Sequence, residues 1–166
     1  MKTGLAALAL ALCATSLNAA DFMHKASGLK FTLPEGWTCK EKKGRLEIEN
    51  EDKTVAIVGG VIPKKSAKEI FKDIKKFLDS LDGFDDIEVA SGPEKETVNG
   101  LEQAWYEGTA KVKDDDGEAE EIEWDLTIVT GGKGILFLVG IGKLEEDEDA
   151  YSEFFDSIEK AEAVSE

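Results

Sequence analysis

Two segments of this chain are apolar on both faces of an extended strand, and they restrict the possible folds more than any other feature. They span residues 54–62, where Gly59 and Gly60 interrupt the apolar run, and residues 135–141. Such a strand belongs in the interior of a sheet whose two faces are both covered. The chain must therefore build a central sheet with a further layer on each side.

Shorter segments alternate apolar and polar residues, which is typical of strands with one buried face. Residues 29–33, 46–48 and 122–128 have this pattern. Turn sequences separate the strands at residues 34–36, 42–45, 99–100, 114–117 and 131–134. The Asn-Gly pair at 99–100 is a strong signal for a tight hairpin. Because short turns join the late strands, we expect them to be antiparallel neighbours.

Two amphipathic helices are predicted to pack on the sheet. The first begins at Ser66, which is expected to form a capping box with Glu69, and ends before Gly83. The second begins near Leu144 and carries an apolar stripe of Tyr151, Phe154, Phe155 and Ile158. The sequence thus predicts an α+β fold, a mainly antiparallel sheet of about seven strands covered by two amphipathic helices.

This pattern resembles the PsbP/DcrB-like fold group. The resemblance rests on residues 28–37 (GLKFTLPEGW), the amphipathic helix after residues 61–63, the hairpin at 99–101 and a closing helix with Phe155 and Ile158. It covers nearly all of residues 22–161. The group consists of exported, mostly non-catalytic domains that serve as accessory subunits, envelope lipoproteins, binding modules or chaperones. The resemblance implies a fold and a binding role, and it transfers no functional residue.

The first 20 residues have the layout of a secretory signal peptide. Lys2 precedes an apolar run over residues 5–13, and small and polar residues follow. We expect cleavage between Ala20 and Asp21. Residues 21–166 would then form a single domain that is periplasmic or secreted.

A second interpretation makes Cys13 a lipid-modified cysteine, although lipoprotein signals need a small residue where Leu12 stands. After the signal, no segment approaches the ~20 apolar residues of a membrane-spanning helix, so the mature chain is expected to have no transmembrane span. Cys39 would then be the single cysteine of the mature chain, which excludes an intrachain disulfide. A buried thiol is favoured there over a redox or dimer-linking role.

The chain is strongly acidic, with 20 Lys and Arg, 36 Asp and Glu, and a formal net charge of −16. The charge is uneven, because residues 21–80 carry a net +3 and residues 81–166 a net −20. Nucleic acid and anionic lipid surfaces should repel such a chain. The acidic half is either a solvated face or a surface that recognises a cationic partner or divalent ions.

Residues that could carry catalysis are scarce. His24 is the single histidine, and it is expected near a loose chain end, which disfavours a hydrolase triad or a histidine-based zinc site. The glycine-rich turn at 131–134 lacks the Ser or Thr and the helix of a phosphate loop. We therefore predict no catalytic residue and no cofactor.

Three adjacent aspartates, Asp114, Asp115 and Asp116, are weak candidates for a divalent ion. They lack the alternate spacing of a calcium-binding loop. An acidic hairpin turn is the main interpretation.

A possible interaction surface comes from one strand pair. Glu121, Glu123 and Asp125 alternate with apolar residues, so they are expected on the wet face of their strand. Trp105 is expected to point outward and Tyr106 inward. An outward tryptophan either lies under a helix or marks a binding surface.

The sequence therefore favours an exported, non-catalytic binding or accessory protein that acts by surface recognition, with another protein of the envelope or exterior as its partner. Two alternatives stay open. One is a carboxylate-dependent envelope hydrolase, and the other is an acidic protein that binds divalent ions.

Overall fold

The computed structural model describes residues 19–81, 84–113, 118–130, 132–142 and 148–164. The expected signal sequence through residue 18, with Cys13, lies outside these ranges, as do Asp114, Asp115 and Asp116.

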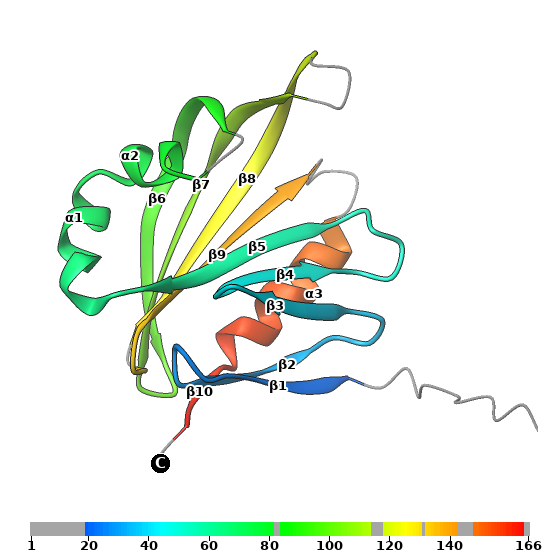
Figure 1. Cartoon of the computed structure of the whole chain (residues 1–166), viewed down its shortest axis with the longest axis vertical. Coiled ribbons are helices and arrows are strands. Elements are labelled where there is room, and N and C mark those ends of the chain that lie inside the picture. Colours follow the sequence, from blue (N-terminus) through cyan, green and yellow to red (C-terminus); the bar gives the residue numbers. More distant parts are fainter. Residues whose placement is uncertain (1–18, 82–83, 114–117, 131, 143–147, 165–166) are drawn as a thin grey trace, which may run out of the picture.

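A seven-stranded sheet forms the centre of the molecule, in the order β3-β4-β5-β9-β8-β7-β6 (Figure 1). Each strand is antiparallel to its neighbours. The predicted sheet is confirmed, and the two doubly apolar segments are the adjacent strands β5 and β9. The strands are β3 (Thr38–Lys42), β4 (Arg45–Glu49), β5 (Ala56–Ile62), β6 (Asp85–Val98), β7 (Leu101–Lys113), β8 (Ala119–Val129) and β9 (Ile135–Gly142).

The sheet consists of two meanders that meet along one seam. Strands β3 to β5 form the first meander, and β6 to β9 form the second. The seam is the β5–β9 pair, in register from Ala56 opposite Ile141 to Ile62 opposite Ile135. The hairpin at 99–100 forms as predicted, since both residues have positive φ angles of 52° and 78°.

A separate three-stranded sheet has the order β1-β2-β10, with β1 (Ala20–His24), β2 (Leu29–Leu33) and β10 (Glu162–Ala163). Strand β1 was not expected from the sequence. It begins at Ala20, so cleavage after that residue would keep the strand from Asp21 onward. The Asp21 carboxylate lies 2.7 Å from the Lys30 ammonium on β2 and so ties the strand to its neighbour.

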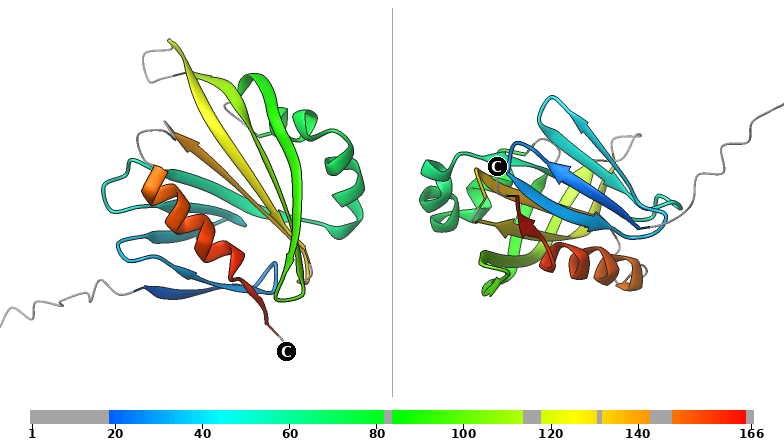
Figure 2. Two further views of the ribbon diagram at one scale, coloured as in Figure 1. Left: turned by 180° about the vertical axis from the view of Figure 1, so that it is seen from behind. Right: turned by 90° about the horizontal axis from the view of Figure 1, so that it is seen from below.

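The helices cover opposite faces of the central sheet (Figure 2). After a short 3-10 turn (Lys64–Ser66), α1 (Ala67–Lys72) and α2 (Ile74–Asp79) lie over one face, and α3 (Glu148–Glu159) lies over the other.

The expected single helix after Ser66 was wrong in two respects. The helix is interrupted at Asp73, where φ is −147°. The Asp73 side chain accepts a hydrogen bond from the Lys76 backbone N–H at 3.0 Å. This aspartate is thus the cap of α2. The expected capping box does not form, because Ser66 belongs to the preceding 3-10 turn and makes no side-chain capping bond.

Two apolar clusters follow from this layering. One lies between the central sheet, the small sheet and α3, and it includes Phe31, Ile48 and Phe154. The other lies between the central sheet and α1–α2, and it includes Leu78 and Trp124. Within the described ranges, no helix has the length and apolar character needed to cross a membrane.

Candidate binding groove

A groove of about 440 Å³ lies between α3 and the part of the central sheet made by β6, β7 and β8. Figure 2 (left) shows α3 crossing the sheet obliquely, with β6 to one side of it. Among the described residues that line the groove, none is Lys, Arg or His. Its walls are therefore strongly acidic. The lining carboxylates are Glu94, Glu96, Glu107 and Asp125 from the sheet and Glu148 and Glu159 from α3.

One side of α3 forms the outer wall. Glu148, Tyr151, Ser152, Phe155 and Glu159 recur three or four residues apart, apart from the neighbouring pair 151–152, so they share one side of the helix. The wall has charged ends and an aromatic centre.

The sheet forms the floor. Trp105 and Glu107 of β7 point to the same face, and they pair directly with Thr127 and Asp125 of β8. Directly opposed residues have Cβ atoms about 4.5–5.5 Å apart, so Glu107 and Asp125 hold two carboxyl groups side by side. The Ser91 hydroxyl of β6 donates a hydrogen bond to Glu107 Oε2 at 3.0 Å and orients that carboxylate.

Asp125 is half-buried beneath α3. Removal from water raises the pKa of its carboxyl to about 6, and the nearby carboxylates of Glu107 and Glu123 add to the increase. At neutral pH the group is still mainly ionised, in a position where ionisation is unfavourable. A cation in the groove would relieve this unfavourable energy and would bind more tightly as a result.

Two residues that line the groove each carry a buried hydroxyl oxygen without a hydrogen-bond partner in the described part of the chain. They are Thr127 Oγ1, on a residue that is 1% exposed, and Tyr151 Oη, on a residue that is 6% exposed. Leaving a buried hydroxyl unpaired costs about 1–3 kcal/mol. Both oxygens are enclosed by protein, and the Tyr151 hydroxyl lies against Gly140 of β9, so neither is open to a ligand in the groove.

The structure separates the residues that were expected to form one wet strand face. Glu121 is exposed, Glu123 and Asp125 are partly buried, and Thr127 is buried. Asp125 lies on the expected polar face of β8, but it is half-buried because α3 covers this end of the strand. The alternation of apolar and polar residues correctly gave the orientation of each side chain, but it could not show what lies above the polar face.

Trp105 is half-buried and lines the groove beside α3, so it lies at the edge of a helix and is also accessible from a concave surface. Both interpretations drawn from the sequence therefore describe part of its setting. Tyr106 points to the opposite face and is buried, as predicted.

His24 was expected at a loose chain end, and this expectation was wrong. It is fully buried at the end of β1, with Nδ1 3.0 Å from the Ser27 hydroxyl. Desolvation lowers the pKa of the imidazole, although the charge of Glu41 opposes this effect. With both groups enclosed, the pair has no access to a substrate.

Cys39 is free and half-buried, and it packs against the cluster beneath α3. Burial, together with the charge of Glu41, raises the pKa of its thiol to about 11. The favoured interpretation of an unreactive apolar thiol agrees with this environment. Across the described ranges, no group of three or more His, Cys, Asp or Glu side chains is arranged to hold a metal ion.

Sequence reasoning missed the groove residues on α3. Tyr151 and Phe155 were recognised as members of an apolar stripe, and their second contact with a polar sheet face had no signal in the sequence. A usable signal was Glu107, which follows the Trp105-Tyr106 pair and points to the same face as Trp105.

The fold and groove define an α+β domain with a seven-stranded antiparallel sheet and helices on both faces. Among solved structures, the cyanobacterial PsbP protein (CyanoP) from Synechocystis is similar over 90% of this chain and 95% of its own, with 15% identity and a TM-score of 0.58. A point mutant of the protein Mog1 matches 89% of this chain and 97% of its own, at 11% identity and a TM-score of 0.53.

A protein from Bacteroides thetaiotaomicron is 14% identical, covers 90% of this chain and 50% of its own, and has a TM-score of 0.49. No protein-family model matches the chain, and no curated protein matches it significantly. The expected PsbP/DcrB-like fold is confirmed.

Proposed function

We propose that this protein is an exported, non-catalytic binding or accessory protein whose acidic groove receives a basic side chain of a partner protein. The observation that carries the proposal is the groove itself, with six carboxylates and no basic residue among its described lining. The PsbP-like fold is compatible with an accessory role, and the signal-like first 20 residues support export.

The chemistry of the groove favours an arginine or lysine side chain over a bare metal ion. Trp105, Tyr151 and Phe155 supply aromatic surface beside the carboxylates. Ammonium and guanidinium groups are attracted to the faces of aromatic rings, and the apolar stem of a lysine or arginine packs well against these rings.

A calorimetric titration tests this proposal. The probe is a capped pentapeptide with one arginine and one lysine, and its control is the same peptide with citrulline and acetyl-lysine. We expect measurable binding of the charged peptide, weakened by salt, and at least tenfold weaker binding of the neutral one. Equal binding of the two peptides would refute the proposal.

Matched variants separate local recognition from the overall charge. The double variant Glu107→Gln/Asp125→Asn removes two charges from the groove floor, and Glu51→Gln/Asp52→Asn removes two exposed charges from the β4–β5 turn. The first pair should weaken binding about tenfold or more, and the second less than twofold. A similar loss in both would show that the peptide responds only to net charge.

A second candidate function is a carboxylate-dependent hydrolase, because Glu107 and Asp125 stand directly opposite each other and one has a raised pKa. Retaining glycosidases place two carboxyl groups about 5–5.5 Å apart. Chromogenic nitrophenyl glycosides test this candidate. Release of nitrophenol that is abolished by Glu107→Gln and by Asp125→Asn would support it over simple binding.

Export has its own test. The intact mass of the protein recovered from outside the cytoplasm should correspond to a chain that begins at Asp21. A retained first segment, or a lipid attached to Cys13, would contradict this part of the proposal.

A further inference from the structure

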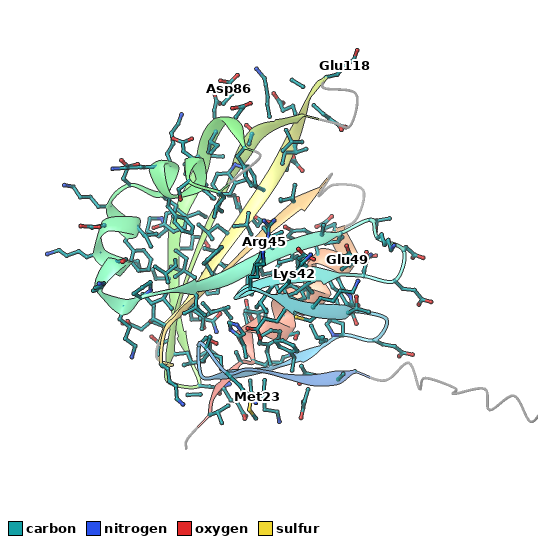
Figure 3. The ribbon with its side chains drawn as sticks, in the orientation of Figure 1. Met23, Lys42, Arg45, Glu49, Asp86 and Glu118 are labelled. Atoms are coloured by element: carbon teal, nitrogen blue, oxygen red, sulfur yellow. The ribbon has the colours of Figure 1, made fainter. Side chains whose placement is uncertain are left out.

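The face of the central sheet that packs against α1 and α2, opposite the acidic groove, carries a row of residues with an unusual composition. Lys42 pairs with Arg45 across β3 and β4, Arg45 with Gly60 across β4 and β5, and Gly60 with Phe137 across β5 and β9. Figure 3 shows Lys42 and Arg45 close together near the middle of the molecule. The row thus runs from two cations, over a residue without a side chain, to an aromatic ring.

A second groove of about 310 Å³ lies along this row, between β4–β5 and the end of α2. Its walls include five half-buried apolar side chains, from Val58, Leu81, Phe84, Phe137 and Ile141. These residues pack at the margin of the α1–α2 cluster, where the helices leave part of the sheet uncovered.

Gly60 keeps this groove open. A Cβ atom at this position would lie 2.9 Å from the Phe137 ring, so any larger residue would occupy the space or displace the ring. The neighbouring Gly44 faces open space, with no atom within 4 Å of the point that a Cβ would occupy. The two glycines leave room between the cationic end and the apolar walls.

The mouth of the groove is basic in a chain with a net charge of −16. Lys43 and Arg45 line it, both are exposed, and within the described ranges neither forms an ion pair. Glu47 points to the same face of β4 and pairs with Val58, so it limits the positive charge available. This balance suits a single negative charge better than a dianion.

We propose that this groove binds a medium-chain fatty acid, with its carboxylate at Lys43 and Arg45 and its alkyl chain along Val58, Phe137 and Ile141. The charge of the mouth complements a carboxylate, and arginine binds carboxylates with two parallel hydrogen bonds. The volume lies at the lower end of small-molecule sites, which excludes large lipids and favours one narrow chain. The site is independent of the acidic groove, since the two lie on opposite faces of the sheet.

Titration with saturated carboxylates of eight, ten and twelve carbons, below their micelle concentrations, tests the proposal. Each additional buried methylene should increase affinity about fourfold until the groove is filled. The methyl esters should bind at least tenfold more weakly than the acids. Methyl NMR signals of Val58 and Ile141 should shift on binding. Equal affinity of acids and esters, or absence of binding at millimolar concentration, would overturn the assignment.

Two test variants and one control variant locate the site. Arg45→Gln/Lys43→Gln changes exposed residues only and should reduce affinity tenfold or more, whereas Lys64→Gln/Lys65→Gln removes the same charge from the exposed 3-10 turn and should have little effect. Gly60→Val should block the alkyl chain, and circular dichroism would verify that this variant folds. Binding that survives the Arg45 and Lys43 changes would refute the proposed head-group position.

Discussion

The substitution Asp125→Asn should make the protein more stable at neutral pH. The pKa of this carboxyl is raised from 3.8 to about 6, mainly by burial and further by Glu107 and Glu123. A shift of about two units corresponds to roughly 3 kcal/mol of unfavourable ionisation. Because Asp125 is only half-buried, solvent screening reduces this figure to about 1–2 kcal/mol.

The effect has a defined pH window. A carboxyl with a raised folded-state pKa binds its proton more strongly in the folded protein, so its contribution to stability is lost as pH rises through about 6. Asparagine avoids that loss. The advantage of Asp125→Asn should be complete at pH 7.5, should decline below pH 6 and should be small near pH 4.

Chemical denaturation at pH 7.5, 6, 5 and 4 measures this difference, and the melting temperature at pH 7.5 should rise by about 3–6 °C. Glu121→Gln is the matched control, since it removes one exposed charge from the same strand. A gain that equals the control, or one that does not vary with pH, would refute the assigned environment of Asp125.

Three further predictions concern other parts of the structure. Burial lowers the pKa of His24, so this residue stabilises the fold above its unfolded pKa of about 6.5, and this stabilisation is lost on acidification. The substitution His24→Gln should therefore reduce the fall in the free energy of unfolding between pH 7.5 and 5, as measured by chemical denaturation. The thiol of Cys39, with a pKa of about 11, should react with iodoacetamide at pH 7.5 much more slowly than free cysteine, as followed by mass spectrometry. A methyl group on Gly140 would overlap the Tyr151 hydroxyl, so Gly140→Ala should cost about 1–3 kcal/mol, and adding Tyr151→Phe should recover part of the loss in thermal unfolding. A normal alkylation rate, an unchanged pH profile or an additive double variant would each contradict the corresponding environment.

Local patterns in the sequence predicted the central sheet well. The doubly apolar segments became β5 and β9, and Asn99-Gly100 became a tight turn, because burial and backbone sterics act over a few residues. The order of the strands in the sheet was harder to predict from the sequence. The short turn at 131–134 indicates that β9 pairs with β8, but nothing local indicates that its other neighbour is β5.

The candidate site was only partly predictable for the same reason. The side-chain direction of Trp105 and Asp125 follows from strand alternation, whereas the cover that half-buries Asp125 comes from α3, a distant element. The helix break at Asp73 shows a related limit, because the apolar periodicity continues through Asp73 and concealed its role as the cap of a second helix. Sequence patterns therefore gave the side-chain directions of the groove residues on the sheet and missed the packing of α3 over them.

The seam between β5 and β9 has a consequence for how the chain assembles. Contacts between distant segments form slowly, because a long loop must close before they are made. Strands β6, β7 and β8 and helices α1 and α2 separate β5 from β9 along the chain. Until β9 pairs with β5, one edge of an apolar strand is open to other chains, so the incomplete sheet is the form of the chain most exposed to aggregation.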